Sequence, residues 1–377
     1  MEHPIQRLIK EKAKSPITEK TGTLGRPKSF GLLDATASAA RDKDFKHENF
    51  GRDILLKRPD IANAIEDFNS DNEIGNIFTK DHIDNFKYSQ FVTGTLDADR
   101  LDFLLRDSLA AGVSYGNIDL KYLLDNFQYD KDTDQFYIDY SGIHALEHFI
   151  TSRFFLYNVT YHKTVMGFEL LAKHAFYRMA KDEQIDVIAA EGELQELLGD
   201  TDQFVRFDDQ YFWLKLREWQ PADALDVAVR RALLFRQPAR ELFSERDLVN
   251  SSPDQKASPS RVLNSQLYNN IAFDQLIERH RVDRSQLAVL TNEIEFEESA
   301  PMKARFEQPD IRQEWALCKV FYDDHITPLI DVPGSIVQTL SYMNLRIRRL
   351  YYLPLDENQK LKRDELRAEI RALAADT

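Results

Sequence analysis

The segment over residues 96–107 concentrates the residue types that could do chemistry in this chain. It reads Leu-Asp-Ala-Asp-Arg-Leu-Asp-Phe-Leu-Leu-Arg-Asp, so four carboxylates and two arginines alternate with leucines at helical spacing. Asp99, Arg100 and Phe103 fall near the start of the predicted helix. A carboxylate is a hard ligand for Mg²⁺ or Mn²⁺, and a neighbouring guanidinium can hold phosphate oxygens. The same pattern also suits a solvated helix face of acid–base pairs.

A helix over 97–111 is expected to carry these residues. Leu101, Leu104, Leu105 and Leu109 recur at helical spacing, and Gly112 follows as a C-cap. Other patterns predict a helix over 47–68 broken near a proline, one long helix from 142 to about 181, a β-hairpin over 127–140 and a strand around 346–352. Shorter helices are expected at 81–86, 118–126, 191–198, 208–218, 221–234 and 358–374. The fold class is therefore mainly α, with a small hairpin and a mixed α/β C-terminal part.

Residues 96–120 as a whole resemble the final-aspartate helix of the HD-domain phosphohydrolases. The branch is that of the deoxynucleoside triphosphate triphosphohydrolases, the bacterial dGTPase-like proteins and the vertebrate SAM- and HD-domain-containing dNTPase. The resemblance implies that Asp99 is the last metal ligand, that Arg100 contacts the nucleotide phosphates and that Asp107 holds the sugar 3′-hydroxyl. Phe103 stands where the family often has a tyrosine near the phosphates or sugar.

Two further stretches resemble the family in the same order along the chain. His47 and Glu48 match a His-Glu-x-x-Gly segment, which implies that they lie beside the metal and assist hydrolysis. His162 and Lys163 match the end of the family's long helix, Tyr-x-His-Lys, and imply that the lysine approaches phosphate. Thr160 occupies the position of that tyrosine.

The family's His-Asp metal ligands are missing from this sequence. The run over residues 22–31 resembles the family segment that carries them, but Gly22 and Thr23 occupy the two positions and Arg26 replaces the next histidine. No His-Asp dipeptide occurs anywhere in the chain. Mg²⁺, Mn²⁺ or Fe is the cofactor that the resemblance implies, and a lone Asp99 cannot fix such a cation well, because these sites need several ligands. We therefore expect a degenerate metal site.

Three other features of the sequence each allow a functional and a structural interpretation. His144 and His148, with Glu147 between them, have the spacing of a metal pair, but isolated helix histidines are common. The single Cys318 is a core or surface thiol, or a nucleophile. The basic, aromatic run over 346–352 suits a nucleotide or single-strand contact, or a strand buried in the fold or in a homo-oligomer interface.

Composition narrows the class of protein further. The 377 residues carry a net charge of −14, which argues against a protein that coats nucleic acid. One cysteine excludes a disulfide framework and fits a reducing cytoplasm. No apolar run approaches the roughly 18 residues of a membrane span, and the first 20 residues lack the apolar stretch of a secretory signal. A cytoplasmic protein that does not bind membranes is expected.

The resemblance divides the chain into four parts. They are an N-terminal segment with the degenerate HD motif over 1–46, an HD-domain-like helical core over 47–190, a helical accessory region over 191–260 and an α/β region over 261–377. The favoured hypothesis is a regulatory homo-oligomer subunit that binds a nucleotide. The alternative is an active metal-dependent enzyme that splits a (deoxy)nucleoside triphosphate into nucleoside and triphosphate. The third hypothesis is an α-helical interaction protein whose match to the family motif is accidental.

Overall fold

The structure is a computed structural model of the chain. It describes residues 47–66, 73–79, 86–182, 184–185, 199–206, 208–244, 271–295, 318–340 and 344–376. The predicted helix at 191–198 and the run over 22–31 lie outside these residues, as does most of the predicted helix at 81–86. No helix in the described ranges has the length and apolar character that crossing a membrane requires.

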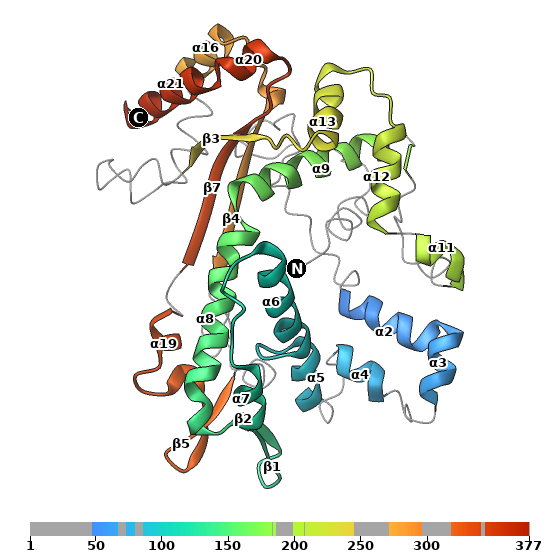
Figure 1. The fold of residues 1–377 in the computed structure, drawn as a ribbon, viewed down its shortest axis with the longest axis vertical. Helices are drawn as coiled ribbons and strands as arrows, with labels where there is room; N and C mark the ends of the chain where they lie inside the picture. Colours follow the sequence, from blue (N-terminus) through green and yellow to red (C-terminus); the bar gives the residue numbers. More distant parts are fainter. Residues whose placement is uncertain are drawn as a thin grey trace, which may run out of the picture. The chain divides into compact units, whose positions relative to one another are not determined.

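The chain folds into two compact units, and each is built from stretches that are separate in the sequence. One comprises Lys46–Thr160 with Glu293–Leu345, and we call it the α6 unit after its helix α6 (Ala98–Ala111). The other contains Tyr161–Asn292 with Arg346–Thr377, and we call it the α9 unit. Mainly helical elements and small sheets make up both, which confirms the predicted fold class (Figure 1). The four-part division stays a prediction.

The α6 unit is a set of helices packed beside a four-stranded sheet of order β1-β2-β5-β6. The predicted hairpin is confirmed, because β1 and β2 pair antiparallel. The second strand then pairs in parallel with β5 through Ile138 and Val320. Its elements are α2 (His47–Lys57), α3 (Pro59–Ile65), α4 (Glu73–Thr79), α5 (Phe86–Thr93), α6, α7 (Leu120–Asp125), β1 (Phe127–Asp130), β2 (Gln135–Ile138), α8 (Ile143–Thr160), β5 (Lys319–Tyr322), β6 (His325–Pro328) and α19 (Ile336–Leu340).

Helix α6 forms where the leucine spacing predicts it. It ends at Gly112, which adopts the left-handed conformation at φ 68° that favours glycine. Leu104 is fully buried, but Leu109 is 84% exposed, so its predicted place on the apolar face is wrong. The buried side of the last turn carries Ser108 instead. A small residue fits there because Gly116 approaches so closely that a Cβ would lie 2.7 Å from the Ser108 side chain.

The single long helix predicted from 142 to about 181 is wrong. The chain forms two helices, α8 and α9 (Lys163–Lys181), separated at residues 161–162. His162 has extended backbone angles, and its Nδ1 accepts a hydrogen bond from the Thr164 amide at 3.3 Å. The apolar spacing continues through the break, since a change of backbone direction does not require a change of residue type. The break at Pro59, by contrast, was predicted and is confirmed.

The α9 unit contains a three-stranded sheet of order β3-β7-β4. The strand predicted around 346–352 is confirmed as β7, and the helices predicted at 208–218 and 221–234 are confirmed as α12 and α13. Its elements are α9, α11 (Thr201–Arg206), α12 (Asp209–Glu218), α13 (Ala224–Leu234), β3 (Arg240–Ser244), α16 (Ile271–Arg279), most of β4 (Leu287–Glu295), most of β7 (Asn344–Tyr352), α20 (Glu357–Leu361) and α21 (Arg363–Asp376).

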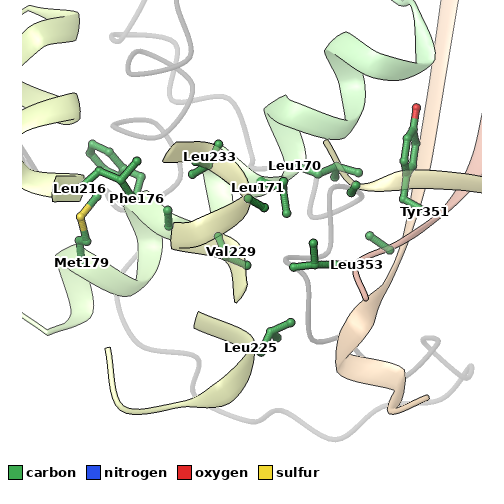
Figure 2. Packing of buried hydrophobic residues seen from close by; sticks show 14 of the residues in the cluster. Leu170, Leu171, Phe176, Met179, Leu216, Leu225, Val229, Leu233, Tyr351 and Leu353 are labelled. Carbon is green, nitrogen blue, oxygen red and sulfur yellow. The ribbon is translucent and has the colours of Figure 1, made fainter. Parts of the chain in front are cut away.

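Alternate residues of a strand point to opposite faces of the sheet, and here each face packs against a separate core cluster. Leu287 and Val289 of β4 join the cluster that includes α16 and α21. Ala288 and Leu290 join the cluster formed with α9, α12 and α13. Figure 2 shows part of the second cluster. Its labelled members are Leu170, Leu171, Phe176, Met179, Leu216, Leu225, Val229, Leu233, Tyr351 and Leu353.

Candidate functional site

Asp97 and Arg100 form a fixed pair at the start of α6. Asp97 is the N-cap residue and is only 2% exposed. Its Oδ1 accepts a hydrogen bond from the Arg100 amide at 2.7 Å. The Arg100 Nη1 donates to Asp97 Oδ2 and to the carbonyl oxygen of Gly94. The guanidinium is therefore held by residues at the start of its own helix, and 30% of the Arg100 side chain is exposed.

Arg153 of α8 supports this pair from inside the α6 unit. It is buried, and its Nη1 donates to the carbonyl oxygen of Thr95 at 3.0 Å. Burial raises the pKa of the Asp97 carboxyl, while the positive charges of Arg100 and Arg153 act in the opposite direction. Neither Asp97 nor Arg153 is a site residue that the sequence predicts. An aspartate directly before a helical run is an N-cap signal, and an arginine among apolar helix residues signals a buried partner.

The other predicted residues of α6 lie along one side of the helix. Asp99, Phe103 and Asp107 are spaced by four residues, which places them on neighbouring turns. Asp99 is exposed in the first turn. Phe103 is half-buried and packs against the core of the α6 unit. Asp107 is half-buried, and its Oδ1 lies 3.8 Å from Arg106 Nη1. This side of α6 thus offers carboxylates, a guanidinium and an aromatic ring.

Four predicted residues lie on other helices. His47 and Glu48 are the first two residues of α2, in the same unit as α6, and their side chains are outside the described residues. His162 and Lys163 are exposed at the start of α9, in the other unit. His162 caps that helix, and Lys163 accepts a hydrogen bond from Tyr351 through its carbonyl. That these four residues form one site with the residues of α6 stays a prediction.

The described residues do not fit a divalent metal. Among the described side chains, no group of three His, Cys, Asp or Glu residues could hold an ion. His144 pairs instead with Glu147 at 3.3 Å, and Glu147 also accepts a hydrogen bond from the Ile336 amide. Cys318 is buried, as expected of a core thiol. The role of Asp99 as a metal ligand therefore stays a prediction.

Comparison with known sequences gives two partial matches. No protein-family profile matches the chain. It is 29% identical over 135 residues to the uncharacterized protein YwfO of Bacillus subtilis, covering 35% of this chain. It is also 29% identical over 146 residues to the uncharacterized protein MJ1154 of Methanocaldococcus jannaschii, covering 38% of this chain. The matched part spans about 30% of the length of each relative.

Comparison with solved structures extends the likeness to most of the chain. A phosphohydrolase from Bacteroides thetaiotaomicron, BT4208, superposes with a TM-score of 0.52 at 18% identity, over 82% of this chain and 76% of that one. A hypothetical protein from Aquifex aeolicus superposes with a TM-score of 0.56 at 17% identity, over 84% of this chain and 70% of that one. The chain therefore shares its fold with a phosphohydrolase.

Proposed function

We propose that this chain is a nucleotide-binding relative of the HD-type dNTP triphosphohydrolases that lacks their metal centre and acts as a regulatory, oligomer-forming subunit. One observation carries the proposal: Asp97 holds the Arg100 guanidinium at the start of α6, beside the exposed Asp99. The fold shared with a phosphohydrolase supports it. Gly22 and Thr23, in place of His-Asp, argue against a metal bound by this chain alone.

Nucleotide binding would use residues that the fold already positions. A guanidinium fixed in advance loses little entropy when it binds, and charge-assisted hydrogen bonds to phosphate are strong. Arg100 would bind phosphate, and Asp107 would accept a hydrogen bond from a sugar hydroxyl. Phe103 lies between these two residues in the sequence, and the edge of its ring would contact the sugar.

An active hydrolase is the second candidate. It is favoured by the placement of His47 and Glu48 at the start of α2, in the same unit as Asp99. In this case another copy of the chain would complete the metal site. His47 and Glu48 would then move protons, and Arg100 would neutralise charge that develops on the phosphate. Release of triphosphate from a dNTP in the presence of Mn²⁺, abolished by Asp99→Asn, would establish this candidate and overturn the first.

Calorimetric titration with dGTP tests the first candidate. The titration is done with EDTA, so that binding cannot depend on a metal. We expect Arg100→Gln to weaken binding about tenfold, since it removes a charge-assisted contact. Asp97→Asn should weaken it similarly, because asparagine still caps the helix but no longer anchors the guanidinium by charge. Lys121→Gln is the control: Lys121 is an exposed cation on α7 of the same unit, paired with Asp125. Equal affinity of Arg100→Gln and Lys121→Gln would refute the proposal.

A further inference from the structure

A cleft of about 200 Å³ lies within the α9 unit, apart from the residues discussed so far. The pairing of β3 with β7 creates it. Arg240 at the start of β3 lies opposite Tyr352 at the end of β7. The turn that precedes β3 and the loop that follows β7 therefore meet at one end of the sheet. Helix α13, helix α20 and the first residue of α21 complete the walls.

Part of the lining of the cleft is apolar. It includes Ala232 of α13, Pro238, Leu353 and Leu355. Leu353 belongs to the same cluster as Val229 of α13 (Figure 2), so the loop is packed against that helix.

Hydrogen bonds to two glutamines fix the backbone of the same loop. The buried Gln286 donates to the Leu353 carbonyl at 3.0 Å and to Gln359 Oε1 at 2.8 Å. Gln359 Oε1 also accepts from the Leu355 amide at 2.8 Å. The cleft therefore has a preformed base.

The walls carry four positive charges and two carboxylates, Asp356 and Glu357, in a protein whose net charge is −14. Arg231 and Arg240 are exposed, and neither has an ion-pair partner among the described residues. Lys360 lies 3.3 Å from Glu357, and Arg363 lies 2.7 Å from Asp364. These two ion pairs involve exposed carboxylates, so they are weak and can exchange for a stronger anion.

We propose that this cleft binds a phosphate chain, either a free oligophosphate or the phosphate chain of a nucleotide. Two unpaired guanidiniums that face one small cavity are suited to bidentate phosphate binding. The volume decides what part of a ligand can enter. Pockets for whole drug-sized molecules have about 300–1,000 Å³, so this cleft suits a phosphate chain and leaves any attached nucleoside outside. The site is independent of the function proposed above, since it shares no residue with it.

Calorimetry with sodium triphosphate tests this site. The measurements use the full chain carrying Arg100→Gln, at low salt, so that binding near α6 is already weakened. We expect Arg231→Gln and Arg240→Gln each to lower the affinity for triphosphate about tenfold, and the double variant to lower it further. Arg206→Gln is the matched control, because Arg206 is an exposed arginine of the same unit on α11, outside the cleft. It should bind triphosphate unchanged.

A second arm distinguishes the two sources of the phosphate chain. Triphosphate and dGTP are titrated separately into the same proteins. Equal affinities would assign the site to the phosphate chain alone, and tighter dGTP binding that is still lost in Arg231→Gln/Arg240→Gln would assign it to a nucleotide. Absence of triphosphate binding, or equal binding by the double variant and Arg206→Gln, would overturn the proposal. Neither result would depend on whether dGTP binds through Arg100.

Discussion

At the scale of single residues, two buried aspartates among the described residues each meet a partner of opposite charge. Asp97 is paired with Arg100, and Asp226 of α13 is paired with two residues of α9. His174 Nε2 lies 2.7 Å from Asp226 Oδ1, and Arg178 Nε donates to Asp226 Oδ2 at 2.7 Å. Burial lowers the pKa of the His174 imidazole, and the hydrogen bond to Asp226 opposes this shift. This group ties α9 to α13 inside the main core.

The lowered pKa of His174 predicts that the free energy of unfolding depends on pH. Its pKa is lowered on folding, so the folded state binds fewer protons than the unfolded state when the pH falls below about 6.5. The free energy of unfolding should therefore fall as the pH is lowered from 7 towards 5. Urea denaturation at several pH values measures it. His174→Gln should unfold more easily at pH 7 and lose part of this dependence. His148→Gln, at an exposed position, should behave as wild type. An unchanged pH slope in His174→Gln would contradict the prediction.

At the scale of elements, a glycine allows α9 and the chain entering β3 to pack closely together. Gly167 is buried in α9, and a Cβ at this position would collide with the backbone carbonyl of Ala239, just before β3. A backbone atom cannot rotate away as a side chain can. We therefore expect Gly167→Ala to lower the free energy of unfolding by about 1–3 kcal/mol. Gly199→Ala is the control, since no described atom lies within 4 Å of a Cβ there. Equal unfolding midpoints of the two variants would refute the close approach.

At the scale of the whole molecule, several large apolar side chains of the α9 unit face solvent. Phe235, Ile271 and Leu361 are 68%, 74% and 79% exposed in the single chain. Contacts between copies of a chain bury exposed apolar side chains, so these three positions are the ones we would test for such contacts. We expect sedimentation velocity to give a mass above the 43.9 kDa of one chain, and Ile271→Lys to shift it towards that value. A single species at 43.9 kDa in the wild type would count against the oligomeric subunit.

The sequence by itself determined the features that depend on near neighbours along the chain. The leucine spacing predicted α6, Pro59 predicted the break between α2 and α3, and alternation predicted the hairpin β1–β2. Each follows from backbone preference and local burial pattern, which residue types encode directly. The absence of a His-Asp pair is likewise a property of the sequence alone.

Only the tertiary structure decided which distant residues meet. Arg153 of α8 meets the Thr95 carbonyl beside Asp97, and His174 of α9 meets Asp226 of α13, and no local pattern specifies such a partner. The break before α9 was also hidden, because the apolar spacing continues through it. The four cations of the cleft are separated by up to 132 positions in sequence. They come together because β3 pairs with β7, and strand pairing between distant segments is set by the packing of the whole sheet.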